Sequence, residues 1–431
     1  MAKLGGLWIL LFFCTIQMLT YFDRGVMSGL LTVAEAEFKL NGAESGALGT
    51  AYFVAVMIVA PILPGFFIGA NGKTQMYGIA LGSFLWALAT LLCGSASSYG
   101  SLLAGRTLTG FGEAFYALLA SPIIDDGAPP GRKSLYQGAF YALVYVASGV
   151  GFAAPSFCNS WKSGSFIFYS EAAVMMPLVL FAVVRGADFH GRDASELPLQ
   201  TRSPELRSGC KHAATSTWLV LSNLGYLCFA LGYAALIFSL NGWNFWGPSY
   251  LEEVMNFKKS AGNIELGAVV VVAGLAGSAL GGVALDRISG PGTNSQQRCI
   301  AAARMCVLSA AAAWPFGMAA LAVRNHWLFL GVMFIYFMLL TMATAPSVIG
   351  MMEAVPSECR GIAMGLSSFG CHIFGDVLSP FVVGILKDRY GSLVPGAYVL
   401  MLWGVLTIAF WGLASIRMSS SSNRLANVLP N

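Results

Sequence analysis

The stretch Gly105-Arg106-Thr107-Leu108-Thr109-Gly110-Phe111-Gly112-Glu113-Ala114-Phe115-Tyr116 places two opposite charges in a segment that is otherwise suited to lipid. Ionisable side chains at bilayer depth are costly, so they usually face a cavity and serve a transport pathway. Seven residues make two helical turns, so Arg106 and Glu113 share one helix face at a spacing of roughly 10 Å. This spacing is too long for a direct bond. Each side chain should therefore find a partner on another helix, such as Asp23 for Arg106.

The composition around this stretch is that of a membrane protein. The chain has 431 residues, of which 57% are hydrophobic and 10% are charged, whereas soluble domains carry roughly 25% charged residues. A net charge of +4 gives no reason to expect a nucleic-acid partner. The nine cysteines show no CxxC pair or cysteine–histidine cluster, so neither a metal nor another cofactor is expected.

Apolar stretches long enough to cross a bilayer, about 20 residues each, recur about twelve times. The sequence predicts an all-α integral membrane fold of two six-helix halves, residues 1–186 and 217–431, joined by a cytoplasmic linker at 187–216. The predicted spans are 4–31, 45–70, 74–96, 99–125, 134–157, 165–185, 217–250, 262–286, 298–322, 326–353, 360–386 and 393–416.

The two halves show signs of an internal sequence repeat. Pro122 and Pro346 are expected to end matching helices, Pro155 and Pro380 the next pair, and the separation within each pair is nearly the same. Parallel six-helix repeats around a central site at the bilayer midplane are the architecture of the major facilitator superfamily. Lysines and arginines are more frequent in the cytoplasmic loops if both termini are cytoplasmic, which predicts that orientation.

Asp23, in Tyr21-Phe22-Asp23-Arg24, lies well inside the first predicted span. Burial disfavours the charged form of a carboxyl group unless it is paired, so Asp23 can bind and release a proton near physiological pH. A structural Asp–Arg pair that fixes helix packing is the alternative. Glu113 is a second proton-sensitive candidate, and Arg106 suits a phosphate or carboxylate headgroup because its guanidinium binds such groups in a bidentate manner. An ion-pair latch between helices is the competing interpretation here.

His372 and Asp376 are four residues apart in the eleventh predicted span and share a helix face. Histidine titrates near neutral pH, and a neighbouring carboxylate favours its charged form. This pair is a candidate functional site, although a hydrogen bond inside the helix bundle explains it equally well.

Candidate gating residues lie near the ends of predicted spans. Asp286 and Arg287 form an Asp-Arg step between the eighth and ninth spans, of the kind that locks one face of such transporters by charge pairing. Asp125 and Arg132 are further gating candidates in the first half. The loop Gly65–Lys73, which corresponds to the Asp-Arg step, lacks both Asp and Arg, so the first-half gate should be weaker or built differently.

These motifs together resemble the Spinster family of major facilitator transporters. The resemblance extends through all twelve spans. It rests on the helix 1 motif around Asp23, on the run from Arg106 to Asp125 with its Gly-Glu-Ala-x-Tyr pattern ending at Tyr116, and on the His-x-x-Gly-Asp-x-x-Ser-Pro stretch that starts at His372. The resemblance implies transport of lysolipids, either sphingosine 1-phosphate or lysophospholipids. It also implies that Asp23, Arg106 and Glu113 lie in the central cavity. Tyr116 and His372 are two further candidate substrate-binding residues.

The leading hypothesis is a proton-linked secondary transporter for an anionic lysolipid, acting as a monomer in the plasma membrane or a lysosomal or endosomal membrane. A transporter of a small polar substrate, such as a sugar or an organic anion, is the alternative within transport. A membrane-embedded enzyme would need a nucleophile, a base and an orienting group at suitable spacing, and no such triad is evident near His372 or Ser367. A lipid sensor that binds without transporting remains a further hypothesis.

Overall fold

In the part of the chain that the computed structural model describes, twelve helices are long and apolar enough to cross a membrane, and their positions match the predicted spans. The structure describes residues 6–59, 62–63, 72–129, 132–186, 217–290, 295–356 and 359–428. The predicted linker at 187–216 and most of the loop Gly65–Lys73 lie outside these ranges. The all-α membrane fold predicted from the apolar stretches is confirmed.

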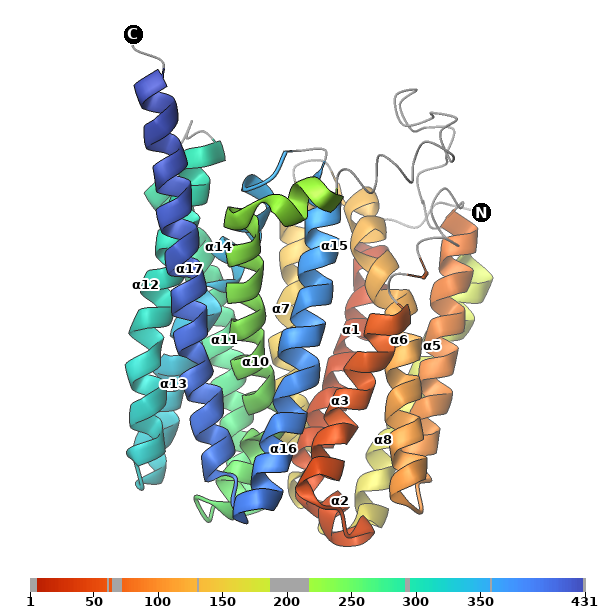
Figure 1. Ribbon diagram of the computed structural model, residues 1–431. Coiled ribbons are helices and arrows are strands. Elements are labelled where there is room, and N and C mark those ends of the chain that lie inside the picture. Colours follow the sequence, from red (N-terminus) through yellow and green to blue (C-terminus); the bar gives the residue numbers. More distant parts are fainter. Residues whose placement is uncertain are drawn as a thin grey trace. The chain divides into compact units, whose positions relative to one another are not determined.

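The helices group into two compact units, each with its own internal packing. The first unit contains every described element before residue 187, together with Phe245–Val271. Figure 1 shows α5 and α6 side by side in this unit. Its elements are α1 (Gly6–Gly29), α2 (Leu31–Phe38), α3 (Gly42–Val59), α5 (Gly72–Gly94), α6 (Tyr99–Gly127), α7 (Lys133–Ala153), the short 3₁₀ turn η1 (Ala154–Phe157) and α8 (Trp161–Arg185).

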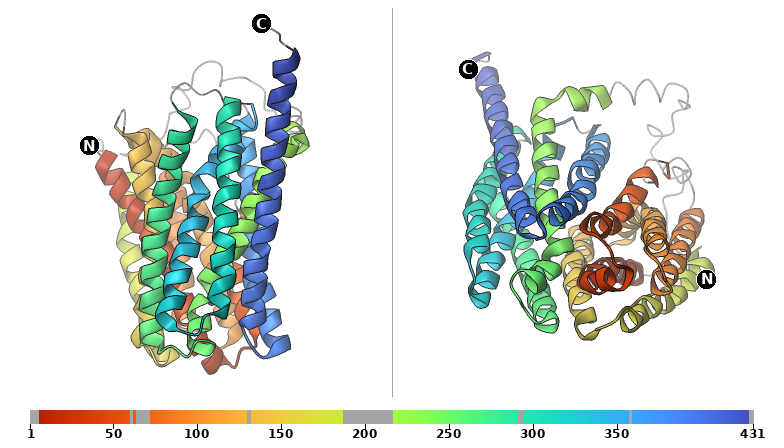
Figure 2. Two further views of the ribbon diagram at one scale, coloured as in Figure 1. Left: turned by 90° about the vertical axis from the view of Figure 1, so that its left-hand side faces the viewer. Right: turned by 60° about the horizontal axis from the view of Figure 1, so that its bottom comes forward.

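The second unit contains the described residues from 217 to Asn244 and those after Val271. Helices α12 and α17 pack along each other in it, as Figure 2 shows. The elements of this part of the chain are α10 (Leu224–Glu253), α11 (Lys259–Ser289), α12 (Ser295–Ala322), α13 (His326–Met342), α14 (Thr344–Glu353), α15 (Arg360–Cys371), η5 (His372–Val377), α16 (Leu378–Tyr390) and α17 (Val394–Val428). The boundary between the two compact units passes through α10 and α11, so each of these two helices contributes residues to both units.

The expectation that four prolines end helices is wrong for three of them. Pro122 lies inside α6, and Pro346 and Pro380 lie in the first turns of α14 and α16. α14 and α16 continue the spans His326–Glu353 and Arg360–Tyr390, so these two prolines also lie inside a span. Membrane helices also accept internal proline where neighbouring groups satisfy the freed carbonyl. Only Pro155, in the turn η1, stands where a helix ends.

Helices of the first unit approach closely at glycines. An added Cβ at Gly25 of α1 would lie 2.4 Å from the carbonyl oxygen of Ser148, and one at Gly151 of α7 would lie 2.3 Å from that of Phe22. No side chain fits at such distances, so α1 and α7 make backbone contact here. This contact fixes the position of α1 directly beside Asp23 and Arg24.

Candidate functional site

Asp23 of α1 and Arg106 of α6 form a buried ion pair inside the first unit. Arg106 donates a hydrogen bond from Nη1 to Asp23 Oδ2 at 2.6 Å, and the side chains of Arg106 and Asp23 are 3% and 0% exposed. A guanidinium–carboxylate bond of this length is charge-assisted and stronger than a neutral hydrogen bond. Asp23, which the sequence suggested as the partner of Arg106, is therefore its partner in the structure.

Arg24 and Glu113 form a second ion pair beside the first. Arg24 donates from Nη2 to Glu113 Oε1 and also to the hydroxyl group of Tyr52. The Arg24 guanidinium lies 4.2 Å from the ring centroid of Tyr21 and 4.5 Å from that of Tyr52. Adjacent residues on α1 thus bind residues two turns apart on α6, and Asp23 pairs with Arg106 instead of its neighbour Arg24.

Tyr52 of α3 stands between the two ion pairs. Its hydroxyl group accepts from Arg24, while its ring centroid lies 5.6 Å from the Arg106 guanidinium carbon. Gly110 makes this position possible, because a Cβ there would lie 2.1 Å from the Tyr52 carbonyl oxygen. A glycine midway between the two charged residues of α6 therefore lets α3 approach closely enough for its tyrosine to contact both arginines.

Tyr116 is buried in the apolar core of the first unit, one turn beyond Glu113. Its ring packs against Phe140 with 6.3 Å between the centroids. Its hydroxyl group has no hydrogen-bond partner among the described residues. A buried tyrosine hydroxyl usually finds a partner, and a role for Tyr116 in substrate binding stays a prediction.

His372 and Asp376 interact within the second unit. His372 Nδ1 and Asp376 Oδ2 are 2.8 Å apart, and Asn241 of α10 donates to the Asp376 backbone carbonyl at 3.2 Å. The two residues lie in η5, a π-helical turn between α15 and α16. Such turns inside helices often occur at functional sites. The arrangement is consistent with either interpretation of this pair, a functional site or an internal hydrogen bond.

The predicted gating residues lie near helix ends. Asp286, at the end of α11, is exposed and accepts a hydrogen bond at 3.1 Å from Arg298 of α12, which is half-buried. Arg287 beside it is exposed as well. Asp125 is half-buried near the end of α6, and Arg132 is exposed just before α7. Their gating role stays a prediction.

Sequence reasoning missed two charged residues of the first unit. Arg24, the partner of Glu113, enters the sequence argument only as a possible neighbour for Asp23. Glu171 of α8 is fully buried and interacts with both Asp23 and Arg106. Glu171 could have been recognised from the sequence, because it is a lone carboxylate in the middle of the apolar span Trp161–Arg185.

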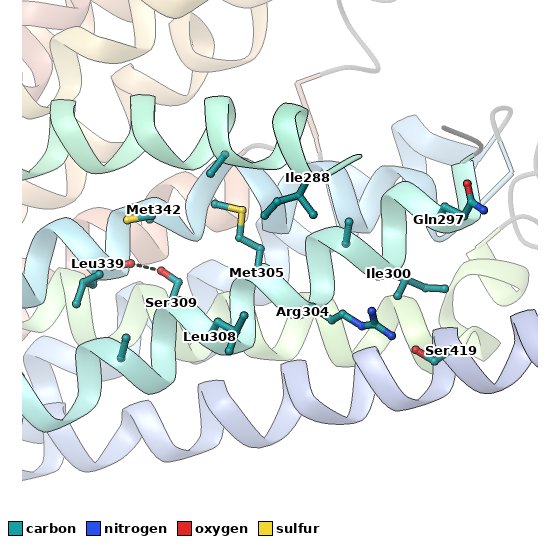
Figure 3. Close-up of a pocket in the computed structure, with 13 residues that line it drawn as sticks. Ile288, Gln297, Ile300, Arg304, Met305, Leu308, Ser309, Leu339, Met342 and Ser419 are labelled. Atoms are coloured by element: carbon teal, nitrogen blue, oxygen red, sulfur yellow. Dashed lines mark hydrogen bonds between the residues drawn. The ribbon is translucent and has the colours of Figure 1, made fainter. Parts of the chain in front are cut away.

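An open groove of about 740 Å³ lies in the second unit, among α11, α12, α13 and α17. Its walls are mostly apolar, with Ile288 and Met342 among them, and Arg304 supplies one cationic side chain (Figure 3). None of the predicted site residues lines this groove. The charged residues singled out from the sequence and this groove are therefore separate features.

The chain is similar to known transporters along most of its length. The family model described as Major Facilitator Superfamily matches residues 13–380. "Probable sphingolipid transporter spinster homolog 3" of Arabidopsis thaliana is 24% identical, over 97% of this chain and 86% of that protein. "Sphingosine-1-phosphate transporter SPNS2" of Danio rerio is 24% identical, over 91% of this chain and 78% of that protein.

The solved structures show the same fold. A bacterial homologue of the human lysosomal transporter Spinster, crystallised in an inward-facing and unoccupied conformation, superposes with a TM-score of 0.80 at 17% identity, covering 97% of this chain and 98% of that one. A point mutant of the nucleoside transporter NupG superposes with a TM-score of 0.73 at 14% identity, covering 94% of this chain and 99% of that one. The predicted resemblance to the Spinster family is confirmed. The chain belongs to the Major Facilitator Superfamily, as a multi-pass membrane transporter of the spinster type and not an enzyme.

Proposed function

We propose that this protein is a secondary active transporter of an anionic lysolipid, of the lysophospholipid or sphingosine 1-phosphate type. It works by alternating access and is linked to protons. The observation that carries the proposal is the pair of arginine–carboxylate bridges in membrane-spanning helices, Arg106 with Asp23 and Arg24 with Glu113. The names of two similar proteins, a probable sphingolipid transporter and a sphingosine-1-phosphate transporter, support the substrate class.

Arg106 is the group that binds the phosphate in this proposal. Its guanidinium presents parallel donors that match a phosphate in a bidentate manner. Asp23 occupies the guanidinium in the structure, so an arriving anion competes with a carboxylate. Removing one partner of a buried ion pair costs about 3–5 kcal/mol, because an uncompensated charge is left behind. Substrate binding therefore needs a way to neutralise the displaced carboxylate.

A proton supplies that neutralisation. When Asp23 or Glu113 binds a proton, its arginine partner is released for the phosphate and no uncompensated charge is left in the site. The anion and the proton then favour each other's binding. Transport is coupled to protons provided that the proton binds the inward-open and outward-open states with different affinities. The buried Tyr116 hydroxyl and His372 are the further substrate contacts proposed here.

The arrangement in the membrane is proposed along the same lines. Residues 1–186 and 217–431 form the two six-helix halves, with residues 187–216 and both termini on the cytoplasmic side. Asp286, Arg287, Asp125 and Arg132 act as gating residues near the helix ends. The protein works as a monomer in the plasma membrane or in a lysosomal or endosomal membrane.

The test is uptake of labelled sphingosine 1-phosphate and lysophosphatidylcholine into proteoliposomes, with and without an inward proton gradient. We expect flux that the gradient increases, that falls as the pH of the outer solution rises, and that Arg106→Ala abolishes. Arg389→Ala is the matched control, because it removes an exposed arginine at the end of α16. It should transport at the wild-type rate.

Three other outcomes would redirect the proposal. Binding of lysolipid without flux by folded wild-type protein would favour a lipid sensor. Absence of both binding and flux would favour a small polar substrate. Lysolipid flux that ignores both the proton gradient and Glu113→Gln would leave the substrate class standing and remove Glu113 from the coupling.

A further inference from the structure

Glu171 is a buried carboxylate for which the transport scheme above has no role. It lies on α8 and is 2% exposed. Neither of its carboxylate oxygens has a hydrogen-bond donor among the described residues. An isolated charge in such a place is very costly, and buried carboxylates normally pair, accept hydrogen bonds or take up a proton. The absence of a donor is therefore an observation that needs an explanation.

The groups that interact with Glu171 come from three neighbouring helices. They are Asp23 of α1, Arg106 of α6 and the thiol of Cys93 of α5, which interacts with all three charged residues. Helices α5 and α8 pack closely, since a Cβ at Gly94 would lie 2.7 Å from the ring of Tyr169. This contact holds the part of α8 that carries Glu171 against α5.

Asp23 and Glu171 each have a carboxylate oxygen that lacks a hydrogen-bond donor among the described residues. Asp23 accepts from Arg106 through Oδ2, while its other oxygen, Oδ1, has no donor among the described residues. Glu171 interacts with Asp23, and neither Asp23 Oδ1 nor the Glu171 carboxylate receives a hydrogen bond from the described residues. A single proton on one of the two carboxyl groups turns this contact into an O–H···O⁻ hydrogen bond.

The net charge of the cluster also indicates one bound proton. Two carboxylates and one guanidinium give the cluster a net charge of −1, inside helices where Asp23, Arg106 and Glu171 are all nearly inaccessible to water. Like charges at a shared buried site do not both ionise, and the proton belongs to the pair of carboxyl groups. One bound proton brings the cluster to zero net charge.

We infer that Glu171 is a proton-binding site of this protein, holding a proton that it donates to Asp23 Oδ1 while Asp23 pairs with Arg106. The proton resides on Glu171 because Asp23 already accepts the charge-assisted bond from Arg106 and Glu171 accepts none. Transfer of this proton to Asp23 breaks the Glu171 O–H bond and forms an Asp23 O–H bond. The negative charge then lies on Glu171, which interacts with Arg106, and Arg106 Nε has no acceptor of its own among the described residues.

This inference assigns the proton of the proposed transport cycle to Glu171. The role of this proton in coupling rests on the proposed function. Its presence on Glu171 can be measured without any transport assay. The experiment is infrared spectroscopy of the purified full-length protein, titrated across neutral pH in light and heavy water. The carbonyl stretch of a protonated carboxyl group is distinct from that of a carboxylate. We expect this band near pH 7 in the wild type, its reduction in Glu171→Gln, and no change in Glu37→Gln, which alters an exposed carboxylate of α2.

The Glu171→Gln side chain keeps an N–H donor for Asp23 Oδ1, so the variant should fold and retain the Asp23–Arg106 pair. A protonated-carboxyl band of wild-type intensity in folded Glu171→Gln protein would overturn the inference. So would absence of the band from the wild type at neutral pH. These results are independent of lysolipid flux, so a failure of the transport proposal leaves the proton site decided on its own evidence.

The transport arm uses the same variant in proteoliposomes. If the proton on Glu171 is the coupled one, Glu171→Gln should lose most of the increase in lysolipid uptake that the proton gradient produces, while exchange of lysolipid without a gradient continues. Full gradient dependence in Glu171→Gln would contradict a coupling role.

Discussion

Arg106 and Asp23 are 83 positions apart in the sequence, yet a hydrogen bond of 2.6 Å joins their side chains. Asp23 binds Arg106, and its neighbour Arg24 binds Glu113. Both ion pairs therefore join the same two helices, α1 and α6. The sequence indicates which charges lie at bilayer depth, because apolar runs surround them. It does not indicate that Arg24 pairs with Glu113 or that Glu171 joins the cluster, because partner choice depends on helix rotation and packing.

The buried pair should behave as a unit when its members are changed. Asp23→Asn removes the carboxylate that accepts the hydrogen bond from Arg106, which should destabilise the protein by about 3–5 kcal/mol. The double variant Asp23→Asn/Arg106→Gln removes both charges and should lose much less than the sum of the single changes. Thermal unfolding of the four proteins in one detergent measures this. The more exposed pair Asp286–Arg298 is the control, and its cycle should show little change. Additive losses at Asp23 and Arg106 would show that they do not interact.

At the scale of helices, the apolar runs determine where each span lies, and small residues determine how closely spans pack. The predicted and observed spans agree because a membrane-length apolar run has few other folded states. The break after Gly29 that separates α1 from α2, the π-helical turn η5 and the proline positions inside α6, α14 and α16 were not predicted. Such features depend on tertiary contacts that satisfy the backbone locally.

Gly110 provides a test of helix approach in α6. Gly110→Ala would place a Cβ 2.1 Å from the Tyr52 carbonyl oxygen, so α3 and α6 must move apart. We expect a lower melting temperature and weaker binding of lysolipid, because Tyr52 then loses its position between the arginines. Gly100→Ala is the matched control in the same helix, since an added Cβ there meets nothing within 4 Å. Equal melting temperatures and binding for the two variants would show that the close approach is not required.

At the scale of the whole molecule, one compact unit takes in a segment from the second half of the chain. Thr32 of α2 donates to Glu252 of α10 at 2.8 Å, and Lys259 of α11 donates to the Cys158 carbonyl oxygen at 3.1 Å. Gly149 of α7 meets Gly267 of α11, where a Cβ added to Gly149 would lie 2.5 Å from the Gly267 carbonyl oxygen. In the alternating-access cycle proposed above we expect these contacts to break and reform, which makes them candidates for the parts that move.

The contact between Thr32 and Glu252 can be locked to test this. We expect Thr32→Cys/Glu252→Cys to react with a short, reductively cleavable thiol crosslinker, and lysolipid uptake to fall by most of its value and return after reduction. Each single-cysteine variant treated in the same way is the control for the native cysteines. Efficient crosslinking with undiminished uptake would show that this contact stays closed during transport.

The sequence by itself determined the twelve spans, the membrane class, the family resemblance and the residues Asp23, Arg106 and Glu113, because each depends on local composition or on a motif of a few residues. The tertiary structure decided which charges meet, since pairing of Arg24 with Glu113 and the approach of Glu171 to Asp23 require helices far apart in the chain to pack at a particular rotation. It also decided that Phe245–Val271 packs with the first half. Contacts between distant segments are set by the fit of whole helix surfaces, which no short stretch of sequence specifies.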